Sequence, residues 1–347
     1  MTPLTHDTIR PSRVSGLLFA LLSAGAFGLS GSLGRALFDA GWTAGSATLV
    51  RVAIAAVVLA VPAIVALRGR WHLLRRAAGT VIAYGVFAVA GAQLFYFLAV
   101  GHLEVGVALL IEYMAPVVVV GWLWATRGQR PGLLTLLGAT VAVGGLVLLL
   151  GLLSGGVQVD AVGVGWALLA MVGAAVYFVI SGDTSTGLPP VTLAWGGLVV
   201  ALAILGLAAV SGLLPMSVSA SPVRLLPFEL PWWGAVLLLG VVTAAVAYVA
   251  GIAATRRLGA RLGSFVALLE VVAAAGFAWV LLGQAPAAIQ FAGAGLILVG
   301  VVLIRLGEPA ADPSTADVPT AALPDAHEPA GFPHRPAVDA SPAPIPS

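Results

Sequence analysis

The chain has 347 residues, of which 60% are hydrophobic and only 9% are charged, and its mean hydropathy is +1.08. Soluble globular proteins carry about a quarter charged residues, so this composition predicts an integral membrane protein. All 16 basic residues are arginine, and lysine, cysteine and asparagine are absent, which excludes disulfides, thiol chemistry, lysine Schiff bases and Asn-linked glycosylation. The net charge of +2 comes from scattered arginines, which are typical of membrane topology, so we expect no nucleic-acid partner.

Ten apolar runs follow one another along the chain, and each has about the 20 residues that a helix needs to cross a bilayer. We therefore predict an all-α integral membrane protein with ten transmembrane helices. The first run follows Arg10 and Arg13 as in a signal peptide, but it is longer than such a segment and has no small-residue cleavage site before Arg35, so we expect it to remain. The expected spans are 14–34, 44–66, 79–100, 106–125, 132–152, 162–181, 191–213, 232–254, 263–282 and 287–305.

The arginines outside these runs divide unequally between the two sides of the membrane. If the N-terminus is cytoplasmic, the outer loops hold only Arg35 and Arg224. The cytoplasmic segments then hold Arg10, Arg13, Arg68, Arg70, Arg75, Arg76, Arg127, Arg130, Arg256, Arg257, Arg261, Arg305 and Arg335. Because basic residues favour the cytoplasmic side, we expect both termini there. The composition suggests a GC-rich bacterial source, which would place the protein in the bacterial inner membrane.

The two ends of the chain differ from the apolar part. Residues 1–13 form a short cytoplasmic segment before the first span. Residues 307–347 contain ten of the 22 prolines, with Ala, Asp and Ser between them, and such a segment cannot bury a core. We expect a disordered cytoplasmic tail that is inert, with a regulatory role as the alternative.

The second half of the chain resembles the first. “RGQRPGLLTLLGATVAVGGLVLLL” aligns without a gap with “LGQAPAAIQFAGAGLILVGVVLIR”, and chance likeness between apolar helices is the alternative to a true repeat. The alignment pairs Gly138 with Gly293 and Gly145 with Gly300. We predict two five-helix repeats, residues 14–152 and 153–306. Because five is odd, the second repeat enters the membrane from the opposite face, as in secondary transporters that work by alternating access.

Two glutamates interrupt apolar spans at related depths. Glu112 lies about six residues into the fourth span from the outside, and Glu270 lies about seven residues into the ninth span from the inside. A carboxylate in a span costs several kcal/mol unless it is paired, hydrated or protonated, so it faces the bundle interior or a wet cavity. We interpret the pair as substrate or proton-coupling groups, and a structural hydrogen bond to a neighbouring helix is the alternative.

Arg51 is the one basic residue expected inside a span, at nearly the depth of Glu112. We predict an ion pair between Arg51 and Glu112, since each would otherwise be an uncompensated buried charge. Glu270 then lacks an evident partner, although Arg256 or Arg257 lies within possible reach, and this makes Glu270 the better candidate for a proton site.

Other polar residues in the spans are candidates for the lining of a cavity. In “AFGLSGSLG” the side chains of Ser30 and Ser32 line a pliable passage, or the small residues simply permit close helix packing. Pro116 is expected to kink the fourth span and to free a carbonyl group near Glu112. The remaining candidates, for which ordinary core packing is the alternative, are Gln93, Tyr84, Tyr96, Tyr113, Tyr177 and Tyr248.

These segments resemble the EamA-type ten-helix transporters of the drug/metabolite transporter superfamily. The resemblance covers about residues 14–305 and rests on “GLLFALLSAGAFG”, “LVRVAIAAVVLA”, “YFLAVGHLEVGVALLIEYMAP” and “GATVAVGGLVLLL”. “ALLIEYMAP” and “SFVALLE” look most like the branch that exports threonine, homoserine or other amino acids, in which glutamates stand at similar places. The chain departs from the family in three ways: Gln129 and Gln284 replace a frequent glutamate, Ala274 replaces a frequent proline, and the proline usual before Arg51 is missing.

We considered two other classes of membrane protein. An intramembrane enzyme needs neighbouring catalytic groups or metal ligands, but all five histidines fall in loops or tails, so we expect no enzyme activity, no metal and no cofactor. A structural or receptor-like protein would leave the symmetric glutamates unexplained.

The sequence therefore predicts a secondary transporter that exports a small metabolite and is coupled to protons. An amino acid is the leading substrate class, and drugs, nucleosides or other metabolites are the alternatives. The partners that we expect are this solute, the lipid bilayer and protons. Import is the alternative direction of transport.

Overall fold

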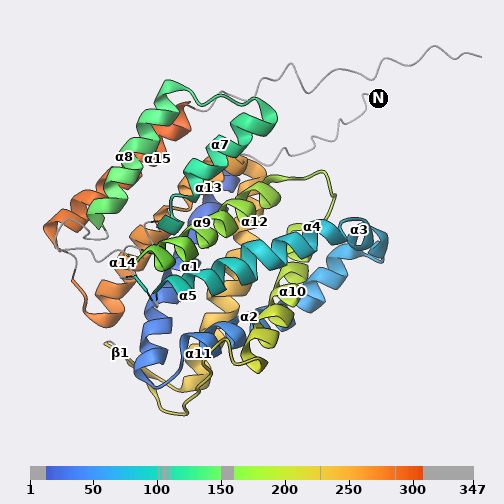
Figure 1. Ribbon diagram of the computed structural model, residues 1–347, viewed down its shortest axis with the longest axis vertical. Coiled ribbons are helices and arrows are strands. Elements are labelled where there is room, and N and C mark those ends of the chain that lie inside the picture. The colour runs from blue at the N-terminus through green and yellow to red at the C-terminus, as the bar shows by residue number, and fades with distance from the viewer. Residues whose placement is uncertain are drawn as a thin grey trace, which may run out of the picture. The chain divides into compact units, whose positions relative to one another are not determined.

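The computed structural model of the chain describes residues 13–100, 102–103, 108, 111–149, 160–226, 228–285 and 287–307. The described part is almost entirely helical (Figure 1). Its α-helices are α1 (Arg13–Asp39), α2 (Ala44–Leu67), α3 (Trp71–Arg76), α4 (Ala78–Ala83), α5 (Ala92–Val100), α7 (Ala115–Arg127), α8 (Leu133–Leu149), α9 (Ala161–Gly182), α10 (Pro190–Val210), α11 (Trp232–Gly240), α12 (Ala247–Leu258), α13 (Ala260–Val266), α14 (Leu269–Leu282) and α15 (Ala288–Gly307). Two π-helical segments, η1 (Tyr84–Gly91) and η2 (Val241–Val246), and two short strands, β1 (Val223–Leu225) and β2 (Phe228–Leu230), complete the described elements.

Seven helical stretches of the described residues are long and apolar enough to cross a membrane. They are Val14–Asp39, Ala44–Leu67, Ala78–Tyr96, Ala161–Gly182, Pro190–Val210, Trp232–Leu258 and Ala260–Leu282. Two shorter apolar helices lie at Leu133–Leu149 and Ala288–Ile304. The start of the fourth expected span, the end of the fifth, the N-terminal residues 1–12 and the tail beyond residue 307 lie outside the described residues. The chain is therefore a multi-pass helical membrane protein.

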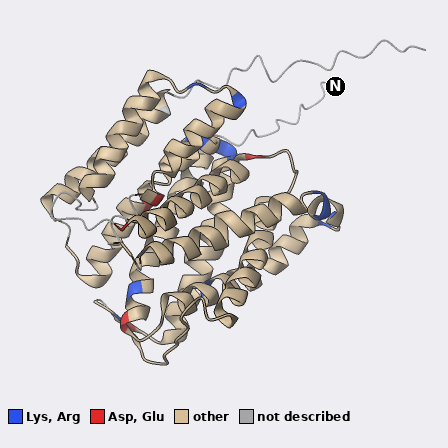
Figure 2. Ribbon diagram, viewed as in Figure 1, with Lys and Arg blue, Asp and Glu red and all other residues tan. Residues whose placement is uncertain are grey.

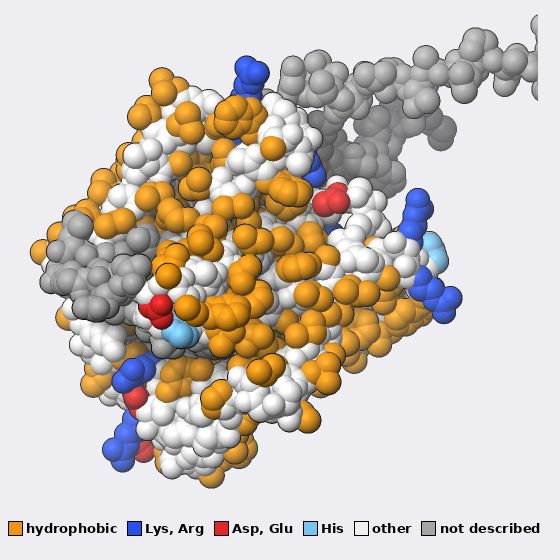
Figure 3. Space-filling view, viewed as in Figure 1, with side chains coloured by type: hydrophobic (Ala, Val, Ile, Leu, Met, Phe, Trp, Pro, Cys, Tyr) orange, Lys and Arg blue, Asp and Glu red, His pale blue; other side chains and the backbone are white. Residues whose placement is uncertain are grey.

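Apolar side chains cover the outer surfaces of the helices. Figure 3 shows hydrophobic side chains over most of the visible face of the described bundle. Figure 2 shows charged residues mainly at helix ends and in the connections between helices. In water such a surface would be a liability, but lipid tails solvate it, so the composition and the fold agree.

α8 and α15 pack against each other along their whole length (Figure 1). Small residues permit this approach: a β-carbon on Gly138 would lie 2.7 Å from the Gly300 carbonyl oxygen, and one on Gly145 would lie 2.7 Å from the Gly293 carbonyl oxygen. The residue numbers rise on one helix as they fall on the other, so the two helices run antiparallel. We call these four glycines the glycine seam.

Four of the ten expected spans are locally interrupted. The π-helical segments η1 and η2 lie in the third and the eighth of the expected spans. A turn at Tyr113 and Met114 follows Glu112, where Pro116 cannot donate a backbone hydrogen bond to residue 112. A second turn, at Ala267 and Leu268, precedes Glu270 and separates α13 from α14. Each glutamate therefore lies beside a break in its helix.

A β-hairpin caps one end of the bundle, which the sequence analysis did not anticipate. β1 and β2 pair antiparallel, with Arg224 opposite Glu229 and 3.0 Å between their side chains. The backbone nitrogen of Leu226 donates a hydrogen bond of 2.8 Å to the carbonyl oxygen of Leu281 at the end of α14. Trp42 lies at the same end and donates from Nε1 to the Ser219 carbonyl oxygen at 2.8 Å. The hairpin thus anchors the long α10–α11 connection near the ends of α1 and α14.

Candidate functional site

A cavity of about 990 Å³ lies among the helices of the bundle. Its walls come mainly from α1, α2, α5, α9, α12 and α14, and a cavity of this size accommodates a drug-sized or metabolite-sized solute. Most of its lining is apolar or small, and polar groups are few. The candidate residues that the structure places in its lining are Ser30, Ser32, Arg51, Gln93, Tyr96, Glu112, Tyr113, Pro116, Tyr177, Tyr248 and Glu270.

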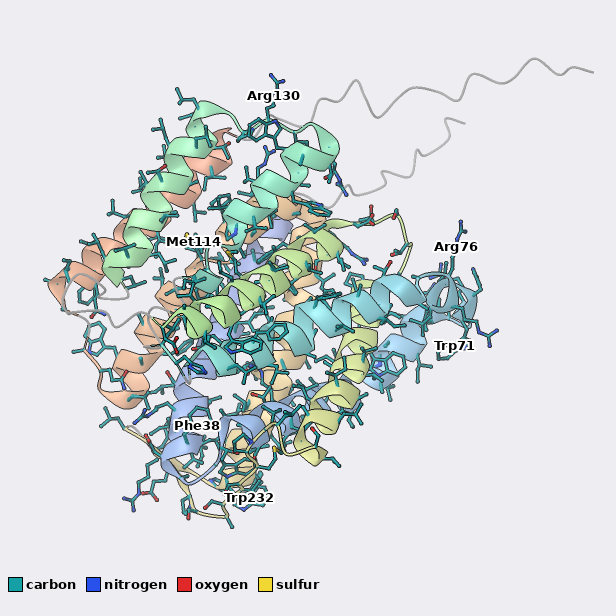
Figure 4. All side chains as sticks on the ribbon, in the orientation of Figure 1. Phe38, Trp71, Arg76, Met114, Arg130 and Trp232 are labelled. Carbon is teal, nitrogen blue, oxygen red and sulfur yellow. The ribbon has the colours of Figure 1, made fainter. Side chains whose placement is uncertain are left out.

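The cavity reaches the surface at the end of the bundle that carries the α1–α2 connection. At this end its lining includes the exposed Arg35 and Phe38, together with Gln284 of the α14–α15 connection. At the other end its lining includes Thr255 and Ser264, both about 1% exposed. Figure 4 shows Phe38 and Trp232 at one end of the described bundle, with Arg130 at the far end from them. We call the Arg35 end the mouth of the cavity and the Thr255 end its floor.

Arginine side chains and close glycine contacts seal the region beyond the floor. Arg256 donates from Nη1 to the Leu188 carbonyl oxygen, and Arg261 donates from Nη2 to the Gln129 carbonyl oxygen at 2.8 Å. Each bond ties the α12–α13 region to a connection between two other helices. A β-carbon on Gly16 of α1 would lie 2.9 Å from the β-carbon of Arg257. The exposed side chains of the lining therefore lie toward the mouth, and buried residues form the floor.

Arg51 is buried at 8% exposure and faces the cavity from α2. Its Nη2 donates a 2.6 Å hydrogen bond to the Thr243 carbonyl oxygen in η2, and its guanidinium carbon lies 5.8 Å from the centre of the Phe27 ring. Within the described part of the chain no ion pair joins Arg51 to Glu112, so that prediction is wrong. Among the described residues no ion pair joins Arg51 to Glu270 either, although the two groups lie within longer electrostatic range.

The two glutamates enter the cavity from the two broken helices. Each is partly buried, and the carboxyl groups are near enough to interact electrostatically. The side chain of Tyr113 lines the same cavity and lies near enough to both glutamates to interact with them electrostatically. Gly28 of α1 permits the close approach of α14, because a β-carbon there would lie 2.9 Å from the Glu270 carbonyl oxygen. The structure thus places Glu112, Glu270 and Arg51 around one cavity.

Aromatic side chains form one wall of the cavity. The Tyr248 ring packs edge-on against Phe27 with centroids 5.1 Å apart, and it lies 6.0 Å from the ring of Tyr177. The side chains of Gln93 and Tyr248 line the same cavity. Tyr84 differs from the expectation, because its ring is fully buried against Gly197 of α10 and does not line the cavity. Because Gly197 has no side chain, the Tyr84 ring fits between the helices at this position.

Sequence reasoning missed six uncharged polar residues of the lining: Ser23, Thr48, Thr255, Ser264, Gln284 and Gln290. Gln290 also donates from Nε2 to the Leu149 carbonyl oxygen at 2.9 Å, which joins α15 to the end of α8. Thr48 lies one helical turn before Arg51 on the same face of α2, and this spacing was an available signal. The sequence marked Gln284 only as a departure from the family pattern and did not indicate that it lines the cavity.

The long apolar helices and the cavity between them define a multi-pass membrane protein with an internal space large enough for a small solute. The model of the EamA-like transporter family matches the chain twice, over residues 14–151 and 161–306. The chain therefore belongs to the EamA-like transporter family. Members of this family are membrane transporters of small solutes and not enzymes.

Solved structures share the fold. One of them, titled “Crystal structure of protein”, has a TM-score of 0.67 and 23% sequence identity, and the match covers 85% of this chain and 98% of the other. At this identity the likeness concerns the fold alone. No curated protein matches the chain.

Proposed function

We propose that the protein is a secondary transporter that exports a small metabolite, an amino acid or a related compound, by alternating access coupled to protons. The observation that carries the proposal is the convergence of Arg51, Glu112 and Glu270 on one cavity. Charged side chains are costly inside a membrane and mark substrate or ion pathways there. The cavity offers one cationic group and two acidic groups, and this combination suits a solute that carries both a positive and a negative charge.

The proposed architecture is ten transmembrane helices in two inverted repeats, residues 14–152 and 153–306. The glycine seam supports the inverted repeat. In space Gly138 faces Gly300 and Gly145 faces Gly293. The sequence alignment instead pairs Gly138 with Gly293 and Gly145 with Gly300. A twofold axis through the seam produces this reciprocal exchange. The two separate matches to one family model give independent support.

We propose a bacterial inner membrane with both termini in the cytoplasm. Under that orientation the mouth of the cavity, with Arg35 and the β-hairpin, faces outward, and the Arg256 and Arg261 contacts close the cytoplasmic side. The arginine distribution supports this assignment. Rocking of one repeat against the other would open the floor and close the mouth.

Glu270 is the proposed coupling residue. Its carboxyl group lines the cavity within electrostatic range of Arg51, so proton binding there would weaken its attraction to Arg51. A proton entering from the mouth would thus change the charge that a solute meets in the same cavity. This arrangement supports antiport, in which a proton and the solute use overlapping groups.

The test is uptake of labelled amino acids, including threonine and homoserine, into inside-out vesicles with and without an imposed proton gradient. We expect gradient-driven uptake by the wild-type chain and its loss in Glu112→Gln or Glu270→Gln. Glu229→Gln is the matched control, because Glu229 lies on the exposed hairpin and pairs only with the exposed Arg224 among the described residues. Unchanged uptake in both cavity variants would overturn the roles of the glutamates, and no uptake of any amino acid would overturn the substrate class.

A further inference from the structure

Three buried hydroxyl groups lie behind the aromatic wall of the cavity, and the proposed transport does not yet use them. They belong to Tyr84, Tyr177 and Ser181, and among the described residues none of their oxygen atoms has a hydrogen-bond partner. Tyr84 and Ser181 are 0% exposed, and Tyr177 is 9% exposed. Proteins rarely bury a polar atom without satisfying it through another protein group or an ordered water molecule. We call these three side chains the hydroxyl cluster.

The members of the hydroxyl cluster lie together where η1 packs against α9. The ring centroids of Tyr84 and Tyr177 are 5.8 Å apart. Ser181 lies one helical turn after Tyr177 on the same face of α9. The residues packed around the two rings are mostly apolar, among them Leu193 and Leu198 of α10. The cluster is therefore a polar spot inside an apolar core.

The hydroxyl cluster extends from the cavity toward the region beyond the floor. Tyr177 lines the cavity, and its hydroxyl oxygen occupies the place where a β-carbon on Gly251 of α12 would lie. At the other end, the residue after Ser181 is Gly182, where a β-carbon would lie 3.1 Å from the β-carbon of Ala260 at the start of α13. Tyr84 and Ser181 do not line the cavity. The cluster thus passes beside the floor and reaches the α12–α13 junction.

Charged side chains stand where the hydroxyl cluster ends. Asp183 follows α9, is half-buried and accepts a 2.9 Å hydrogen bond from the Ser185 backbone nitrogen. Arg256 donates from Nη1 to the Leu188 carbonyl oxygen, while its Nε and Nη2 atoms are buried without a hydrogen-bond partner in the described part of the chain. The Arg256 guanidinium group lies within electrostatic range of both Tyr84 and Asp183. Polar groups therefore continue from the cavity wall to the end of α9.

We propose that the hydroxyl cluster binds internal water and that this water carries the coupling proton from the cavity to the end of α9 while the floor is closed to the solute. Water suits the cluster because each hydroxyl group both donates and accepts a hydrogen bond. A hydroxyl group that accepts a proton from one water molecule gives its own proton to the next, so one proton moves and each group ends neutral. The role of the water rests on the proposed proton-coupled transport, whereas the water site itself does not.

X-ray radiolysis of the purified full-length protein in detergent tests the water site. The X-rays produce hydroxyl radicals from water, including water bound inside the protein, and mass spectrometry locates the oxidised side chains. Phe265 is the matched control, because it is an aromatic residue of 1% exposure packed in an apolar cluster. We expect Tyr84, at 0% exposure, to be oxidised several-fold faster than Phe265. Equally slow oxidation of the two rings would overturn the proposal.

Tyr84→Phe tests the proton route, because it removes the hydroxyl group, keeps the ring and leaves the cavity lining unchanged. In inside-out vesicles we expect uptake of homoserine driven by a proton gradient to fall several-fold, relative to exchange of labelled for unlabelled homoserine without a gradient. Thr140→Val removes an exposed hydroxyl group on α8 and should change neither rate, and melting temperatures report on the folding of each variant.

An unchanged ratio of gradient-driven uptake to exchange in folded Tyr84→Phe would overturn the proton route. A wild-type chain that moves no homoserine would contradict the proposed function and, with it, the role of the water. Radiolysis needs no solute, so fast oxidation of Tyr84 would still support the water site, and the two failures are distinguishable.

Discussion

The glycine seam gives the sharpest prediction about stability. A β-carbon on Gly145 would lie 2.7 Å from both the Gly293 carbonyl oxygen and the Ile297 backbone nitrogen, so the two helix backbones must move apart to admit it. Gly144, the next residue on the same helix, has no atom within 4 Å of such a carbon. Gly145→Ala and Gly144→Ala therefore add the same methyl group, but only Gly145→Ala forces it into a close contact.

The magnitudes follow from two opposing effects. Alanine favours a helix over glycine by about 0.8–1.0 kcal/mol, and this gain applies at both positions. Overpacking a close contact costs about 1–3 kcal/mol, and this cost applies only at Gly145. We expect Gly144→Ala to be neutral or stabilising and Gly145→Ala to lie about 1–3 kcal/mol below it in the free energy of unfolding.

Reversible unfolding in mixed detergent micelles measures this difference. The same comparison on α15 uses Gly300→Ala, where the β-carbon would lie 2.7 Å from the Gly138 carbonyl oxygen, and Gly295→Ala, where nothing lies within 4 Å. Equal free energies of unfolding within each pair would refute the seam as a backbone-to-backbone contact. A lower stability at both seam positions and not at their neighbours would support it.

Two further predictions concern the position of Glu270 and the start of α9. Gly28→Ala should push α14 away from α1, displace Glu270 and lower transport several-fold, whereas Gly25→Ala, with no atom within 4 Å, should transport normally; equal rates in vesicles would contradict this. The backbone N–H of residue 162, and then His102, hold the pKa of the Asp160 carboxyl group below its ordinary value. The ionised Asp160 carboxylate therefore stabilises the fold fully above its unfolded-state pKa near 4. This stabilisation is lost as pH falls through the lower folded-state pKa. Asp160→Asn keeps a helix-capping side chain without the titration, so its melting temperature should fall less than that of the wild type in acid, and parallel profiles would exclude the effect.

The sequence predicted the membrane class and most residues of the cavity for one physical reason. Charged and polar groups are costly in a lipid-facing span, so Arg51, Glu112 and Glu270 had to face the interior, and the structure brings them to one cavity. The same argument did not predict that Arg51 forms no ion pair with Glu112, because its guanidinium group is held by the Thr243 carbonyl oxygen.

The breaks and the buried Tyr84 could not be predicted from composition or spacing. The segments η1 and η2 are as apolar as the helices around them, and a π-helical turn depends on the packing of neighbouring helices. Pro116 predicted the break after Glu112, but no proline marks the equivalent turn at Ala267. Tyr84 and Tyr248 have the same side chain, so sequence alone does not distinguish them. The Tyr84 ring packs in the core because Gly197 leaves space for it, whereas the Tyr248 ring lines the cavity.

The proposed transport requires the solute to pass through the cavity between mouth and floor. The chain contains no cysteine, so Ser30→Cys places a unique thiol on the cavity wall, and Ser221→Cys places one on the exposed α10–α11 connection as the control. The decisive measurement is transport in vesicles before and after complete reaction of each thiol with a bulky charged reagent. We predict that reaction at residue 30 abolishes transport, that saturating solute slows this reaction, and that reaction at residue 221 changes nothing. Full transport after complete reaction at residue 30 would contradict the claim.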